Sequence, residues 1–152
     1  MTARVVERSA LTVMGIELRI NPMAADWSDI WRNKYEPRLP EIEPFATDEA
    51  CLGLYFGTGE AGMVDFVAGR PIKGVTVVPE GLVLREVPGA TEAVFECTME
   101  TIGATWHAIF RDWLPASEYV ADEGLPCYER FAPGCHEGTV PVTIHVPVKK
   151  KA

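Results

Sequence analysis

The chain repeats one order of predicted elements, and this internal repeat limits the folds open to it more than any other feature. A strand, a helix and two strands follow one another over about residues 5–70, and the same order recurs over about residues 81–149. Both predicted helices carry an aromatic pair four residues apart ahead of a Leu-Pro step: Trp27 and Trp31 before Leu39-Pro40, and Trp106 and Phe110 before Leu114-Pro115. The repeat predicts two modules that fold alike.

The first module begins with a strand and a helix. Apolar residues alternate with polar or small ones near the end of residues 5–20, which predicts a strand. Asn21-Pro22 supplies a helix N-cap and then a proline that suits a first helical turn, so we expect the helix to begin there. Pro37 and Pro40 are expected to end it. Its apolar face consists of Trp27, Ile30, Trp31 and Tyr35.

Two short strands, residues 51–56 and 63–68, complete the module and are joined by a glycine-rich connection that suits an antiparallel hairpin. Gly57-x-Gly59-x-x-Gly62 formally matches a dinucleotide fingerprint. It leads into a strand, however, and not into a helix whose N-terminus could bind phosphate. We therefore reject that match and expect no cofactor.

The second module repeats this arrangement. Its predicted elements are strands over residues 82–87 and 93–99, a helix from about Thr101 to Leu114-Pro115, and strands over residues 126–131 and 140–148. Two such units, each with a helix over one sheet face, would pack about a pseudo-twofold axis. A cleft is expected between them, because ligand sites favour junctions that two modules close together. At 152 residues the chain fits one domain.

The charge of the chain narrows the classes of partner. With 14 basic and 22 acidic residues the net charge is −8, so most of the surface would repel a phosphate backbone and no direct nucleic-acid partner is expected. The basic run Lys149-Lys150-Lys151 is interpreted as a solvated tail. A negative field suits a cationic ligand.

No apolar run is long enough to span a membrane, and residues 1–11 lack the features of a secretory signal. We therefore expect a cytoplasmic location and no membrane partner. The cysteines should be reduced thiols there. Their spacing with the histidines matches no metal motif, so no metal site is expected. The four cysteines are Cys51, Cys97, Cys127 and Cys135.

Four stretches of the second half carry a resemblance to a known family. They are a turn leading into a strand, a helix ending in Trp-Leu-Pro, a strand with a glutamate between aromatic residues, and a closing Ile-x-Val-Pro-Val-Lys strand. Their positions are residues 87–95, 105–119, 127–131 and 142–149. In order and spacing they resemble the GyrI-like small-molecule-binding family, which also supplies effector-binding domains of AraC-type and multidrug-responsive bacterial activators. The first half resembles this family more loosely, through the Trp27 and Trp31 helix and Leu54-Tyr55-Phe56.

The resemblance implies an α+β fold. Two pseudo-symmetric β-α-β-β modules would form a curved antiparallel sheet with two main helices and a pocket at the module junction. The family's regulators carry an N-terminal helix-turn-helix, and only about twenty residues precede the first predicted helix here, too few for that element. We therefore expect a stand-alone domain over residues 1–152. A sensor of this kind would act through a regulatory protein or as a homodimer.

Glu129 is the first candidate for a functional side chain. Strand alternation places it on one face with Cys127 and Phe131, so its carboxylate emerges among apolar neighbours. The resemblance implies that this glutamate lies at the pocket floor, where a ligand cation and aromatic faces would stabilise it. The pattern alone equally allows an exposed glutamate paired with Arg130 or Lys149.

Aromatic residues are the candidate walls of the pocket. Most of those on the two helices (Trp27, Trp31, Trp106, Phe110 and Trp113) are expected to be core, with one or two facing the cleft. Tyr55 shares a strand face with the small residues Cys51 and Gly53, which leaves room for a ligand, whereas Leu52, Leu54 and Phe56 are expected to pack against a helix. The predicted ligand-binding set is Glu129, Tyr55, Trp27, Trp31, Trp106 and Phe110.

Three functions are compatible with these residues. In the first, the protein senses or sequesters an apolar or cationic aromatic compound in an acidic, aromatic-lined pocket. In the second, which the resemblance suggests, it hydrolyses cyclopropane-type electrophiles, with Glu129 as base and Tyr55 as acid. In the third, its acidic surface inhibits a DNA-handling enzyme. The third ranks last, because the acidic residues are scattered among Lys and Arg.

Overall fold

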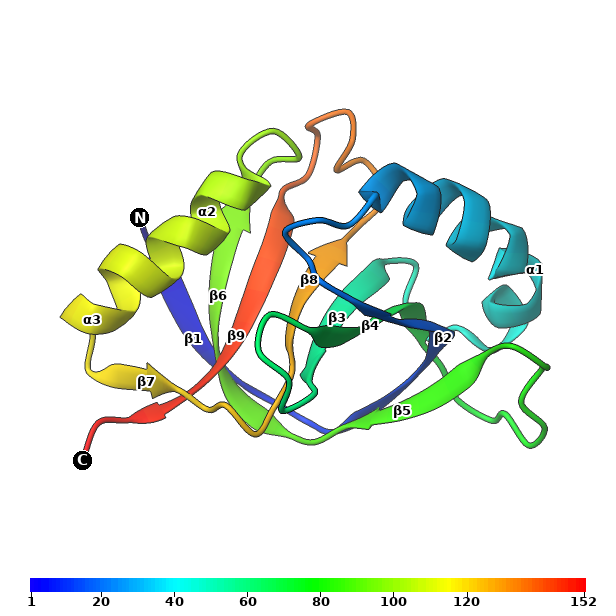
Figure 1. Ribbon diagram of the computed structural model, residues 1–152, viewed down its shortest axis with the longest axis horizontal. Coiled ribbons are helices and arrows are strands. Elements are labelled where there is room, and N and C mark those ends of the chain that lie inside the picture. Colours follow the sequence, from blue (N-terminus) through cyan, green and yellow to red (C-terminus); the bar gives the residue numbers. More distant parts are fainter.

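In the computed structural model, which describes residues 1–152, the strands form one antiparallel sheet and two helical segments lie along one side of it (Figure 1). The predicted α+β class is confirmed. The strands are β1 (Ala3–Arg8), β2 (Leu11–Ile20), β3 (Cys51–Gly57), β4 (Val64–Pro71), β5 (Val83–Val87), β6 (Ala90–Cys97), β7 (Tyr119–Ala121), β8 (Cys127–Phe131) and β9 (Val142–Lys150).

Each helical segment mixes turn types. In the first, the π-helical segment η1 (Asp29–Tyr35) is followed by η2 (Glu36–Arg38), α1 (Leu39–Ile42) and η3 (Glu43–Phe45). In the second, α2 (Ile102–Ala108) leads into the π-helical segment η4 (Ile109–Trp113) and then α3 (Leu114–Ala116). No helix in the structure is both long and apolar enough to cross a lipid bilayer.

The strand order shows the internal repeat directly. It runs β1-β6-β9-β8-β3-β4-β2-β5, with β7 added beside β9. The order is symmetric about its middle: β1 corresponds to β5, β2 to β6, β3 to β8 and β4 to β9. The predicted pseudo-twofold arrangement is therefore present, and β3 of one module pairs with β8 of the other at its centre.

The predicted first strand, residues 5–20, is two strands, β1 and β2, with a break at Ser9 and Ala10. These two strands pair with β5 and β6 in one continuous register, from Ala3↔Phe95 to Gly15↔Val83. Because β1 pairs within the second module's half of the sheet and β2 within the first module's half, this ribbon ties the halves together and curls the sheet.

Both faces of the curled sheet are buried. One apolar cluster contains residues of strands β2, β3, β4, β5 and β8 and no helical residue: Val13, Leu52, Leu54, Val67, Val87 and Tyr128, with Phe56 packed against it. The prediction that Leu52, Leu54 and Phe56 face a helix is therefore wrong. These residues lie on the inner face of the curl, and Tyr55 lies on the face that the helices cover.

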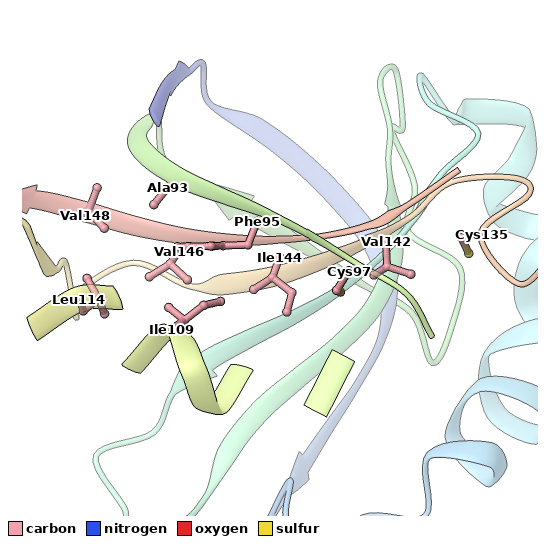
Figure 2. Packing of buried hydrophobic residues seen from close by; sticks show 10 residues of the cluster. All are labelled: Ala93, Phe95, Cys97, Ile109, Leu114, Cys135, Val142, Ile144, Val146 and Val148. Carbon is pink, nitrogen blue, oxygen red and sulfur yellow. The ribbon is translucent and has the colours of Figure 1, made fainter. Parts of the chain in front are cut away.

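The helices pack on the outer face in two separate cores. In the second module Ile109 and Leu114 face β9, as Figure 2 shows for Ile144 and Val146. In the first module Ile30 and Tyr35 pack on Met14, Phe66 and other residues of β2 and β4. The two cores leave the central strands β3 and β8 between them. The candidate site described below lies on these two central strands, at the module junction.

The boundaries of the first helix differ from the prediction. Asn21 Oδ1 accepts a hydrogen bond from the Met23 backbone N–H within a turn, so it caps no helix. Asp26 caps the helix instead, because its Oδ1 accepts a hydrogen bond from the Asp29 backbone N–H. Pro37 and Pro40 do not end the segment either. Each lies in the first turn of a new short helix, where its missing N–H costs no hydrogen bond.

Candidate functional site

The site is centred on Glu129, in the middle of the sheet. Glu129 on β8 lies directly opposite Gly53 on β3, and Tyr55 lies opposite Cys127. Cross-strand neighbours on one face lie close together, and a diagonal neighbour is within reach of a long side chain. Tyr55 is such a diagonal neighbour of Glu129. Alternation therefore grouped each residue with the correct neighbours on its own strand, although it put Tyr55 on the face away from the helices. The β3–β8 register brings Tyr55 and Glu129 together.

Two donors from different elements hold the Glu129 carboxylate. The Tyr55 hydroxyl donates to Glu129 Oε1 over 2.9 Å, and the Trp106 indole N–H, from α2, donates to Oε2 over 2.7 Å. Glu129 is only 7% exposed and forms no ion pair. The alternative in which it is a surface glutamate paired with Arg130 or Lys149 is therefore wrong, because Arg130 instead bonds to Asp48 on the other face of β8.

Burial and hydrogen bonding act on this carboxyl in opposite directions. Burial disfavours the ionised form and raises the pKa of Glu129, whereas the bonds from Trp106 and Tyr55 lower it, and burial wins. Burial, followed by the nearby Glu129 charge, also raises the pKa of the Tyr55 hydroxyl, which therefore keeps its proton. The pair can hold a negative charge beside a neutral O–H donor.

Aromatic rings surround this carboxylate. Trp27 and Tyr55 meet edge to face at 6.2 Å between ring centroids, Tyr55 and Trp106 at 5.5 Å, and Trp31 and Phe131 at 5.3 Å. Trp27, Trp31, Tyr55 and Trp106 are each half-buried, so each keeps part of its surface in solvent. We call this group the seam: Gly53, Tyr55, Glu129, Trp27, Trp31, Phe66, Trp106 and Phe131.

Five of the six residues predicted to bind a ligand belong to the seam. The sixth, Phe110, is 46% exposed and lies parallel to Trp106 at 6.3 Å, at the outer edge. Trp113 packs on Phe95 and Tyr119, away from Glu129, as expected for a core residue. Sequence analysis missed Phe66 as a seam residue, although it pairs with Tyr55 in the β3–β4 hairpin. Only the pairing register of the β3–β4 hairpin could have shown that Phe66 lies beside Tyr55.

Two surface hollows lie outside the seam, so neither of them is the pocket predicted at the module junction. One, of about 360 Å³, is lined mainly by polar residues that include Glu43, Asp48 and Arg70. The other, of about 370 Å³, lies beside Met1 and Trp113. In this structure the seam rings contact one another. No group of three His, Cys, Asp or Glu side chains is placed to hold a metal ion.

A second buried polar cluster lies on the inner face of the sheet. Glu92, which is 1% exposed, accepts hydrogen bonds from Tyr128 over 2.8 Å and from Arg8 over 2.7 Å. His145 Nδ1 lies 3.3 Å from the same carboxylate, and its Nε2 lies 2.8 Å from the Thr143 hydroxyl. Tyr128 and Glu129 are consecutive, so β8 carries one cluster on each face. Glu92 was not predicted as a functional residue, because strand alternation alone does not distinguish this buried acid from Glu96, the exposed acid on the same strand.

The fold and the seam define a duplicated α+β domain with a buried glutamate among aromatic rings at the junction of its modules. The model of the GyrI-like small molecule binding domain matches residues 1–149, and the chain belongs to this family. The resemblance found in the sequence is thereby confirmed.

Two curated relatives show what the chain is similar to. The transcriptional regulator BrlR of Pseudomonas aeruginosa is 31% identical over 127 residues, which cover 82% of this chain, and the match spans 44% of the length of BrlR. A DNA gyrase inhibitor of Erwinia billingiae is 30% identical over an alignment of 164 positions that covers 99% of both chains.

Solved structures share the fold at low sequence identity. SAV2435 bound to tetraphenylphosphonium aligns with a TM-score of 0.75 and 14% identity, over 98% of this chain and 94% of that one. The C-terminal domain of EcmrR aligns with a TM-score of 0.68 and 13% identity, over 99% of this chain and 98% of that one. At such identities the likeness shows the fold.

Proposed function

We propose that the seam binds an apolar organic cation that carries aromatic groups, and that the protein senses or sequesters such compounds. One observation carries the proposal: the buried Glu129 carboxylate has two hydrogen-bond donors and no cation. A buried charge is costly unless a counter-charge meets it. A ligand cation would supply that counter-charge.

The aromatic rings of the seam would supply the apolar and cation–π contacts of such a binding site. Each aromatic face attracts a cation by about 0.5 to 2 kcal/mol, and the value rises as water is excluded. Tyr55 and Trp106 bond to the carboxylate, and Trp27 packs on Tyr55. Trp31 lies one ring further away, because it packs on Phe66, which in turn packs on Tyr55. A cation with aromatic substituents would therefore gain both charge pairing and apolar contact. SAV2435, which shares the fold, was solved with such an ion bound.

Ligand entry would require the seam to open. The rings contact one another in this structure, and five of the six keep part of their surface exposed. Trp31 and Trp106 lie on different helical segments, each with a π-helical stretch, η1 or η4, at or beside the tryptophan. Such stretches occur often at functional sites. Rotation of these indoles, with small movements of the helices, would expose Glu129 to a ligand.

A pair of ions with equal shape and opposite charge tests the proposal. Tetraphenylphosphonium and tetraphenylborate would be titrated into the protein by calorimetry. We expect binding of the cation only. Glu129→Gln should weaken it by about 10- to 100-fold, or about 1.4 to 2.8 kcal/mol, whereas Glu96→Gln, at an exposed position on β6, should leave it unchanged. Equal binding of both ions, or an unchanged affinity in Glu129→Gln, would disprove the proposal.

Hydrolysis is the second candidate function, because Tyr55 and Glu129 meet at 2.9 Å. Glu129 would take a proton from water while the water oxygen attacks a cyclopropane carbon. The breaking C–C bond would pass its electron pair to a conjugated carbonyl, whose oxygen takes the Tyr55 proton. Proton transfer from Glu129 to Tyr55 then restores both groups. Burial raises the pKa of Tyr55, so the hydroxyl is protonated at neutral pH but is a weaker acid than a free tyrosine.

Mass spectrometry of a cyclopropane-bearing electrophile, incubated with the protein, tests this reaction. Addition of one water should be lost in Glu129→Gln and in Tyr55→Phe. It should persist in Tyr119→Phe, since Tyr119 packs on Trp113 away from the seam. If the protein binds tetraphenylphosphonium but adds no water to the electrophile, the hydrolase function is disproved and only the binding function stands.

Inhibition of a DNA-handling enzyme has less support. The relative from Erwinia billingiae is named a DNA gyrase inhibitor, and the net charge of −8 is compatible with such a partner. Several surface acids are neutralised locally, however, as in the pairs of Asp65 with Arg19 and Asp48 with Arg130. A row of free carboxylates that imitates DNA phosphates is not evident. Salt-sensitive binding to a topoisomerase would revive this hypothesis.

A further inference from the structure

Gly53 occupies the position where a side chain would collide with the Glu129 carboxylate. It lies directly opposite Glu129 in the β3–β8 register. A Cβ at Gly53 would lie 3.2 Å from Glu129 Oε1 and 3.0 Å from Phe66 Cζ. Both separations are tighter than ordinary contacts, so the carboxylate and the ring would have to shift. The backbone of Gly53 is not in the left-handed region, so the requirement is for space.

The bond between Glu129 and Tyr55 depends on this space. Tyr55 is two residues beyond Gly53 on the same face of β3, so it is the diagonal neighbour of Glu129. To receive the Tyr55 hydroxyl, the carboxylate must lean across position 53. A methyl group there would push against Oε1, the oxygen that accepts this bond. Trp106 bonds to the other oxygen and would not replace the lost contact.

We propose that Gly53 is a positioning residue of the seam: its missing side chain lets Glu129 lean across β3 to Tyr55 and so fixes where the buried negative charge lies. The use of that charge rests on the proposed function, but its position does not. Sequence analysis identified Gly53 only as a small neighbour of Tyr55. Neither the register with Glu129 nor the approach of Phe66 can be deduced from the residues alone.

A carboxyl titration tests this directly, without any ligand. The ¹³C resonance of the Glu129 carboxyl, identified by its loss in Glu129→Gln, would be followed against pH. In Gly53→Ala a weaker bond from Tyr55 should move its midpoint to higher pH, because that bond favours the ionised form. Gly57→Ala is the matched control, since a Cβ there meets nothing within 4 Å. A midpoint shared by Gly53→Ala and the wild type would overturn the proposal.

Affinity for tetraphenylphosphonium provides the second measurement. We expect Gly53→Ala to bind about tenfold more weakly at pH 7, which corresponds to about 1.4 kcal/mol, and Gly57→Ala to match the wild type. Thermal unfolding should show both variants folded, because alanine is ordinarily favoured over glycine within a strand. If the wild type binds no cation but the carboxyl midpoint moves as expected, the proposed function fails and the positioning role stands. If the wild type binds and Gly53→Ala binds equally well, the positioning role fails alone.

Discussion

The Tyr55 hydroxyl donates a hydrogen bond to Glu129 Oε1 over 2.9 Å, although the two residues are 74 positions apart in the chain. Tyr55 belongs to β3 of the first module and Glu129 to β8 of the second, and these strands pair at the middle of the sheet. The contact therefore forms only when both modules are folded and joined. It makes the site a property of the duplicated fold and not of either half.

Tyr55→Phe removes this donor and keeps the ring. A hydrogen bond to a charged group contributes about 1.5 to 3 kcal/mol, so affinity for tetraphenylphosphonium should fall by roughly tenfold at neutral pH. The pKa of Glu129 should rise further, because one of the two bonds that lower it is lost. Calorimetry at several pH values should therefore show the defect growing as the pH falls. Identical affinities for the variant and the wild type at every pH would contradict this.

Trp106→Phe tests whether the ligand approaches the indole that bonds to Glu129 Oε2 at 2.7 Å. Bound tetraphenylphosphonium should quench tryptophan fluorescence in the wild type, and the part of this quenching that comes from Trp106 should disappear in Trp106→Phe. Trp113→Phe is the control, because Trp113 packs on Phe95 in the core of the second module. It should change stability and keep the quenching. Equal quenching losses in the two variants would place the ligand elsewhere.

Five of the eight seam residues could be predicted as ligand contacts from the sequence because each signal was local. Strand alternation gives the face of Glu129 and of Tyr55, and helical spacing gives Trp27, Trp31 and Trp106. Their meeting could not be predicted, since it depends on the register between β3 and β8. No local pattern fixes the pairing of strands that are so distant in the chain.

The failed predictions share a physical cause. Alternation separates Leu52 and Leu54 from Tyr55 but does not say which face a helix covers, and here the curl of the sheet buries the opposite face as well. In the first helix, Asn21 and Pro22 have a suitable local pattern, but the chain turns there and Asp26 caps the helix. Tertiary packing decided both cases.

Gly15→Ala should be strongly destabilising. Gly15 pairs with Gly69 where β2 and β4 come close together, and a Cβ on Gly15 would lie 2.0 Å from the Ala68 carbonyl oxygen. Because the obstacle is backbone, relief requires the strands to move apart, at a cost of about 3 kcal/mol and a fall in Tm of roughly 6 to 12 °C. Gly57→Ala should change Tm little. The Tm of Gly15→Ala and of Gly57→Ala would be measured by calorimetry. Equal Tm values would show that β2 and β4 can move apart without cost.

The Glu92 carboxylate on the inner face should control stability in acid. Burial raises its pKa, but hydrogen bonds from His145, Arg8 and Tyr128 outweigh burial, and the pKa is lowered. A carboxyl with a lower pKa in the folded state stabilises the protein above its unfolded pKa of about 4.3 and loses that contribution as pH falls toward the folded value. The free energy of unfolding, measured with urea from pH 7 down to pH 3, should therefore decline below about pH 5.

Glu92→Gln isolates this contribution. Glu92 is buried, Arg8 is half-buried, and Arg8 Nη2 already has no hydrogen-bond partner. Arg8 would lose its charged partner there, so the loss at pH 7 should approach the range of about 3 to 5 kcal/mol for a broken buried ion pair. The variant should also lose less stability than the wild type between pH 5 and pH 3, since the titrating group is gone. Glu96→Gln, on the same strand but exposed, should behave as the wild type does. If the two variants unfolded alike at every pH, the acid sensitivity would have to arise outside the Glu92 cluster.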